Sequence, residues 1–172
     1  MIIEERVERS QYVKLITWIV SFIILMAGIV FPVLILWVNQ DMMSKVIGAS
    51  VLCLIFFTLI FTVAYQPRKL ILSETHIIME RILGQVYISY SDITDISLYH
   101  RENVAEIRIF GIGGLGGYIG KFYNSKIGFY TAYVGDYSQA FLIKINNREK
   151  YVMSCRHAEK IVEEVKSRVL KQ

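Results

Sequence analysis

Two long runs without a charged residue constrain this sequence more than any other feature. The runs cover residues 15–38 and 46–65, and 36 of their 44 residues are hydrophobic. At about 1.5 Å per helical residue they would extend for roughly 36 and 30 Å, enough to cross a hydrocarbon layer of about 30 Å. The sequence therefore predicts two transmembrane helices and excludes a disordered tail or one ordinary soluble domain.

The first run is predicted to be a retained span rather than a cleaved signal peptide. It is longer than the apolar core of a typical signal peptide, its leader mixes acidic with basic side chains, and no small-residue cleavage motif follows. Residues 39–45 link the runs, and seven residues can turn a helical hairpin but not form a domain. We expect an N-terminal tail (1–14), a transmembrane hairpin (15–65, with spans 15–38 and 46–65) and one soluble domain (66–172).

The distribution of basic residues predicts which side of the membrane the soluble domain occupies. Five basic residues lie in the tail or directly after the second run, whereas the link holds only Lys45. Because Lys and Arg favour the cytoplasmic side, we expect both termini in the cytoplasm and the hairpin in the cytoplasmic membrane. The five are Arg6, Arg9 and Lys14 in the tail, and Arg68 and Lys69, a membrane-proximal basic pair.

Trp18 and Trp37 lie near opposite ends of the first run. An indole ring is favoured at the headgroup interface, so we interpret the two tryptophans as interface anchors. Neither run holds a charged residue or a histidine. Transporters and proton relays usually need such a group within the membrane, so transport by these two spans alone is not expected.

The soluble domain is predicted to begin with short antiparallel strands. Its 107 residues hold 15 basic and 11 acidic side chains and are enough for one hydrophobic core. Short runs with alternating apolar side chains, separated by polar breaks, are typical of half-buried antiparallel strands. Seven or so strands are expected, drawn from 70–73, 77–83, 85–90, 93–98, 107–110, 129–134, 140–145 and 150–153.

The last segment of the domain changes to a helical period. Its apolar residues recur at i, i+3, i+4, i+7 and i+11, which predicts an amphipathic helix with charged side chains on the other face. Such a helix needs a sheet or barrel mouth to cover, and capping a small antiparallel barrel would also protect a free sheet edge. The stripe consists of Ala158, Ile161, Val162, Val165 and Val169.

Several segments resemble the bacterial pleckstrin-homology-like (PH-like) domain family, whose members often carry one or two transmembrane helices before the domain. The resemblance lies in residues 67–73 (PRKLILS) with 76–79 (HIIM), in 86–93 (VYISYSDI) and in 150–154 (KYVMS). It implies an α+β domain in a bacterial inner-membrane protein. The implied fold is a seven-stranded antiparallel barrel or sandwich of two orthogonal sheets with a C-terminal helical cap. It also implies binding or scaffolding without catalysis.

One departure from the eukaryotic relatives of this family bears on lipid binding. Pleckstrin-homology domains that hold phosphoinositides usually place several Lys and Arg residues around the first strand pair. Here the turn reads Ser73-Glu74-Thr75-His76, and Arg68 with Lys69 falls short of the four to eight basic residues of a polybasic lipid site. Specific phosphoinositide binding is therefore not expected.

Residues 111–116 match the G-x-G-x-x-G pattern of dinucleotide-binding loops, and Asp136 lies twenty residues further on. A dinucleotide loop must open a helix within a parallel strand-helix-strand unit, because the helix N-terminus binds the pyrophosphate. The residues that follow are aromatic, interrupted by glycine, and lead into a strand. We interpret the match as accidental and expect no cofactor.

The same segment is a candidate interaction surface. Six glycines within residues 111–120 predict a loop or wide bulge, and the apolar side chains on and after it suit contact with headgroups or another subunit. The alternative, equally weighted, is that these aromatics fill the barrel interior and the glycines relieve crowding. The candidate residues are Leu115, Tyr118, Ile119, Lys121, Phe122 and Tyr123.

No constellation of residues predicts catalysis or metal binding. Asp92 and Asp95 lie in a turn sequence where carboxylates usually bond nearby backbone, and Ser154 has no identifiable base. Cys155 and His157 lack a second pair of zinc ligands. Nucleic acid is not an expected partner, because the domain's cations are scattered among its acids.

The leading hypothesis is a non-enzymatic membrane-anchored scaffold that binds a protein partner or copies of itself. The alternative is an accessory or sensor subunit of a transport or stress-response complex.

Overall fold

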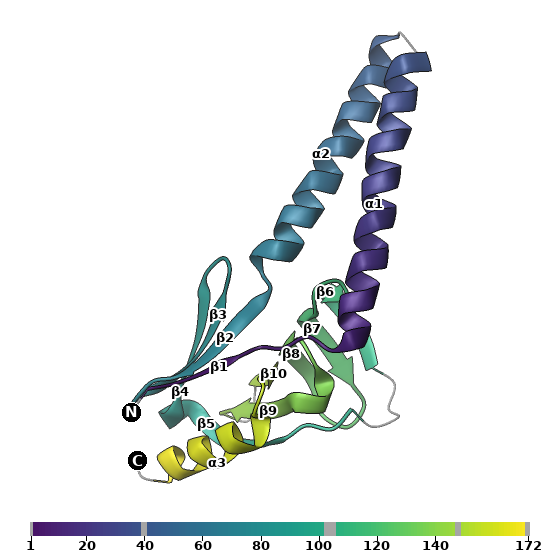
Figure 1. Ribbon diagram of the computed structural model, residues 1–172. Coiled ribbons are helices and arrows are strands. Elements are labelled where there is room, and N and C mark those ends of the chain that lie inside the picture. Colours follow the sequence, from purple (N-terminus) through teal and green to yellow (C-terminus); the bar gives the residue numbers. More distant parts are fainter. Residues whose placement is uncertain (1, 39–40, 102–105, 147–148, 171–172) are drawn as a thin grey trace.

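The computed structural model describes residues 2–38, 41–101, 106–146 and 149–170. Two long helices, α1 (Gln11–Val38) and α2 (Met42–Ala64), extend side by side away from a β-rich domain (Figure 1). Both are long and apolar enough to cross a membrane, and the protein interior buries only 12% and 11% of an 18-residue stretch of each. Exposed apolar faces suit lipid contact. The two candidate spans predicted from the sequence therefore appear as helices, although each helix begins four residues earlier than its predicted run.

The two helices approach closely at a glycine. A β-carbon added at Gly28 would lie 3.0 Å from the Cδ1 atom of Ile55 in α2, so a larger residue there would push the helices apart. Asp41 caps the start of α2, because its carboxylate accepts a hydrogen bond from the Ser44 amide at 3.1 Å. A glycine contact and a capped turn thus support the helical hairpin.

The domain consists of two β-sheets and a C-terminal helix. The four-stranded sheet has the order β1-β2-β3-β4 and the six-stranded sheet the order β5-β9-β10-β8-β7-β6. The first sheet contains β1 (Ile3–Arg6), β2 (Pro67–Leu72), β3 (His76–Arg81) and β4 (Gln85–Ser89). The second contains β5 (Ile93–Leu98), β6 (Glu106–Gly113), β7 (Tyr118–Asn124), β8 (Gly128–Val134), β9 (Ala140–Ile145) and β10 (Glu149–Ser154).

This arrangement differs from the predicted seven-stranded antiparallel barrel in two respects. The described residues form ten strands, and β8 pairs with β10 in parallel, with Thr131 opposite Tyr151. The parallel pair arises because the chain leaves β8 through a 3₁₀ turn, Tyr137–Gln139, and enters β9. The hairpin from β9 then returns β10 to a position between β9 and β8.

The N-terminal tail also differs from its prediction, because it contains a strand of the domain. Ile3–Arg6 pairs antiparallel with β2, placing Ile3 opposite Leu72. On the other side, the Arg156 amide donates to the Arg6 carbonyl at 3.0 Å. Four residues of mixed charge give too short a pattern to indicate a strand, so only the pairing partners reveal it.

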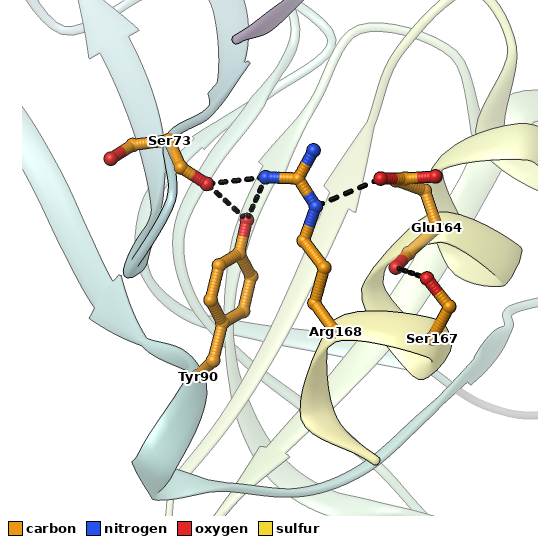
Figure 2. A network of polar contacts seen from close by, with 5 residues as sticks. All are labelled: Ser73, Tyr90, Glu164, Ser167 and Arg168. Carbon is orange, nitrogen blue, oxygen red and sulfur yellow. Dashed lines mark hydrogen bonds and ion pairs between the residues drawn. The ribbon is translucent and has the colours of Figure 1, made fainter. Parts of the chain in front are cut away.

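The predicted C-terminal helix is confirmed. Helix α3 (Ala158–Val169) buries Ile161, Val162 and Val165 against the main core between the two sheets. A polar network fastens its last turn (Figure 2). Arg168 donates to the Ser73 carbonyl and, at 2.9 Å through Nε, to Glu164. The network holds α3 on the sheet. The opposite end of the domain faces α1 and α2 (Figure 1).

Candidate interaction surface

Strand β7 separates the predicted surface residues onto two faces of the six-stranded sheet. Its neighbours on β8 are Tyr130 opposite Phe122 and Thr131 opposite Lys121. Because successive side chains in a strand point to opposite faces, Tyr118 and Phe122 lie on one face and the odd-numbered residues on the other. The second face carries Ile119, Lys121 and Tyr123.

The first face holds a small aromatic core. Phe122 is buried and stacks on Tyr130, with ring centroids 5.8 Å apart, and half-buried Tyr118 contacts Tyr137 at 4.8 Å. Burial raises the pKa of both Tyr130 and Tyr137. Tyr118 and Phe122 therefore pack inside the domain, as in the alternative interpretation of the glycine-rich segment.

A buried carboxylate belongs to this aromatic core. The Glu106 side chain is 3% exposed and lies 2.7 Å from the Arg101 guanidinium. It accepts hydrogen bonds from the hydroxyls of Tyr130 and Tyr99, and Tyr99 in turn accepts one from Asn124 at 2.9 Å. Both hydroxyls bond Oε1, whereas Oε2 faces the Arg101 guanidinium as an ion pair and has no hydrogen bond among the described residues. The ion pair compensates the buried charge, so the geometry supports a packing role.

The second face is partly uncovered, and we call its outer part the distal patch: Ile107, Lys121, Tyr123, Phe129 and Tyr151. Cross-strand pairing brings these side chains together, because Tyr123 lies opposite both Ile107 and Phe129. Ile107 is 55% and Phe129 67% exposed, and the Tyr123 and Phe129 rings meet edge to face at 5.0 Å. A cavity of about 340 Å³ lies beside Phe129, between Lys121 and Tyr151.

The glycine-rich segment forms the hairpin between β6 and β7. Gly111 and Gly120 face one another across this pair, and both have positive φ, +120° and +123°. A β-carbon at Gly111 would lie 2.1 Å from the Ile119 carbonyl oxygen, so the strands can approach this closely only without a side chain. The register shifts between Arg108 and Phe110, which is the local signature of a β-bulge.

The turn of this hairpin contacts the beginning of α1. The Gly116 amide donates to the Thr17 hydroxyl at 2.8 Å, and Gly114 packs on Ile16. Gly116 also lies against the buried Gln66 side chain, which accepts a hydrogen bond from Arg9. The turn therefore joins the six-stranded sheet to the first helix and to the link after the second.

The structure disperses the other predicted site residues. Trp18 and Trp37 are exposed on α1, 19 residues or about 28 Å apart along the helix, a spacing close to the thickness of the hydrocarbon layer. Lys69 forms an ion pair with Glu4 at 3.3 Å, whereas Arg68 is exposed. Leu115 is half-buried in the hairpin turn.

Arg81 is a cation at the end of the second candidate span that sequence reasoning missed. It ends β3, and its guanidinium lies against the rings of Tyr65 and Tyr133. In the sequence Arg81 is a single arginine after an alternating run. The one signal that this arginine lies in an apolar setting is the pair Ile82-Leu83 that follows it. Its position depends on the β3–β4 hairpin, in which the Leu83 amide donates a hydrogen bond to the Ala64 carbonyl at the end of α2.

Within residues 2–38, 41–101, 106–146 and 149–170, no cluster of three His, Cys, Asp or Glu side chains is placed to hold a metal ion. Cys155 is buried, and burial raises the pKa of its thiol to about 12. The His157 ring lies 3.0 Å from Glu5 of β1. These contacts give Cys155 and His157 structural roles at the junction of β1, β10 and α3.

Two apolar helices followed by two sheets and a capping helix define the class of protein: a PH-like domain with N-terminal helices able to anchor it in a membrane. Residues 68–169 match the bacterial PH domain family, so the chain belongs to that family. No curated protein and no solved structure matches it.

Proposed function

We propose that the chain is a non-enzymatic scaffold, anchored by its helical hairpin at the cytoplasmic membrane, that binds a protein through the distal patch. The observation that carries this proposal is the exposure of Ile107 and Phe129 on the second face of the six-stranded sheet. Other side chains on that face, such as Tyr133, pack against the main core. Large exposed apolar side chains gathered in one place are typical of interaction sites.

The position of the distal patch favours a protein over the bilayer. The ends of β6 and β7 next to the hairpin turn contact α1, and the chain runs away from the helices along β7 toward Tyr123. Phe129 lies four residues from Tyr133 along β8, which is roughly 13 Å at about 3.3 Å per residue. The patch is therefore at the end of the strands remote from the candidate spans.

The chemistry of the distal patch also suits a protein contact. Aromatic rings occupy its centre, and the charged side chains of Lys121 and Glu149 border the adjacent cavity. Protein interfaces usually combine an aromatic or aliphatic centre with a polar rim. The partner is expected to present an apolar surface, and a second copy of the chain satisfies this requirement as well as a foreign protein does.

Crosslinking of the full chain in native membranes tests this proposal. We expect Phe129→Ser to abolish a crosslinked species that the wild type forms, and Tyr87→Ser, an exposed aromatic on β4, to leave it intact. The mass of the species separates a second copy from a foreign partner. Equal crosslinking by the wild type and Phe129→Ser, at equal melting temperatures, would exclude the distal patch.

One observation favours the alternative role as an accessory or sensor subunit. The hydrogen bond from Gly116 to Thr17 links the sheet that bears the distal patch to α1, so a shift of the helix would be transmitted to the domain. Under this alternative, a foreign membrane subunit copurifies with the chain at fixed stoichiometry in mild detergent. Recovery of the chain only with copies of itself would favour the scaffold.

A further inference from the structure

A second cavity lies where α2 enters the soluble domain. Its volume is about 160 Å³, smaller than the roughly 300–1,000 Å³ typical of sites for drug-sized ligands, so it suits a small chemical group. The cavity is bounded by the end of α2, by the β3–β4 hairpin and by the open face of the six-stranded sheet. Its lining includes Phe61, Tyr65, Arg81, Phe110, Ile119 and Tyr133.

Arg81 is the cation in this lining. The central carbon of its guanidinium lies 5.2 Å from the ring centre of Tyr65 and 5.6 Å from that of Tyr133. Its Nε atom is buried and has no hydrogen-bond partner among the described residues. Two aromatic rings therefore orient a guanidinium whose buried donor is not used within the described part of the chain.

The cavity lies at the end of the second candidate span that adjoins the domain. Phe61 belongs to the last turn of the candidate span, and Tyr65 follows that helix directly. The Leu83 amide at the tip of the β3–β4 hairpin donates to the Ala64 carbonyl at 2.7 Å, and Figure 1 shows this hairpin beside the lower end of α2. Ile82 and Leu83 are exposed there, as suits apolar side chains that touch the headgroup layer.

We propose that Arg81 binds the phosphate group of an anionic phospholipid in this cavity. A guanidinium presents a planar set of donors that matches phosphate oxygens, and Phe61 and Phe110 supply an apolar wall for the glycerol and the first methylenes. The described lining holds no acidic side chain to pair with the ammonium of a zwitterionic headgroup, which favours an anionic lipid. The site is at the opposite end of β3 from the Ser73–His76 turn.

The proposal is tested on the full chain purified in neutral detergent. Phosphatidylglycerol, phosphatidylcholine and inorganic phosphate are added separately, and bound lipid is counted by native mass spectrometry while the melting temperature is recorded. We expect the wild type to retain phosphatidylglycerol in preference to phosphatidylcholine and to gain stability from it. Arg81→Gln should retain it roughly tenfold less, as loss of a charge-assisted hydrogen bond implies.

Arg68→Gln is the matched control, because Arg68 is an exposed cation on the neighbouring strand β2, and it should bind like the wild type. Equal stabilisation by inorganic phosphate would assign the site to a free anion and overturn the lipid proposal. Equal retention of both lipids by the wild type would also overturn the lipid proposal. This comparison needs no variant, so it tests the proposal even if Arg81→Gln folds poorly. Unchanged binding by Arg81→Gln would also contradict it.

Discussion

The hydroxyl of Thr17 in α1 accepts a hydrogen bond from the backbone amide of Gly116 at 2.8 Å, across 99 residues of sequence. The same hydroxyl donates to the Val13 carbonyl in its own helix at 2.6 Å. One hydroxyl thus accepts a hydrogen bond from the turn of the β6–β7 hairpin and donates another within α1. The contact fixes the domain against the helix at the point where the candidate span begins.

Thr17→Val should lower the free energy of unfolding by about 1–3 kcal/mol, because it leaves the amide of the buried Gly116 without its acceptor. The control is Thr58→Val in α2, whose exposed hydroxyl bonds, among the described residues, only the Leu54 carbonyl of its own helix. Melting temperatures of the full chain in detergent measure both. A loss for Thr58→Val as large as that for Thr17→Val would show that the Gly116 contact contributes nothing specific.

Gly111→Ala should destabilise the chain by more than roughly 2 kcal/mol, because it combines positive φ with a clash against backbone. The new β-carbon would lie 2.1 Å from the Ile119 carbonyl oxygen. Gly113 lies two residues further along β6, and its nearest contact would be 3.6 Å, so Gly113→Ala should change stability by less than about 1 kcal/mol. Similar melting temperatures for the two variants would contradict the close approach of β6 and β7.

Tyr90→Phe should weaken the fastening of α3 and reduce stability by about 1–2 kcal/mol. Tyr90 is 1% exposed, its hydroxyl donates to the Ser73 carbonyl at 3.0 Å, and Arg168 lies beside it (Figure 2). Tyr87→Phe, which removes an exposed hydroxyl from β4, is the control and should be nearly neutral. Hydrogen exchange of α3 provides the readout, and unchanged protection in Tyr90→Phe would argue against the network.

Alkaline conditions should destabilise the domain. Burial raises the pKa of Cys155 from 9.0 to about 12, and burial with the Glu149 carboxylate raises that of Tyr151 from 10.0 to about 12. The neutral forms are favoured in the folded state, so this stabilisation is complete below pH 9 and is lost as pH rises through about 12. Denaturant titrations across this range should show stability falling with pH.

Tyr151→Phe should flatten the alkaline decrease, because phenylalanine has no proton to lose. In the folded chain Cys155 should resist alkylation near pH 9 and react after denaturation, since the thiolate is the reactive form. A pH-independent stability between pH 9 and 12, or rapid alkylation of Cys155 in the folded chain, would contradict the burial of these groups.

Local patterns in the sequence determined the helical hairpin, the capping helix and the family. The two candidate spans follow from two uninterrupted uncharged runs, and α3 follows from the spacing of Ile161, Val162 and Val165. Each of these signals is complete within one segment, because an apolar run or a helical stripe needs no knowledge of its neighbours. The bacterial PH-like resemblance also rested on contiguous segments, and the family match confirms it.

Only the tertiary structure decided which strands pair and which side chains meet. Ile3–Arg6 becomes a strand because β2 offers it an edge, and β8 pairs with β10 in parallel because β9 carries the chain across the sheet. Register assigned Phe122 to the interior and Tyr123 to the distal patch, although the two residues are adjacent. Arg81 reaches the end of α2 through a hairpin contact. These are pairings between distant segments, which propensity and periodicity within one segment do not encode.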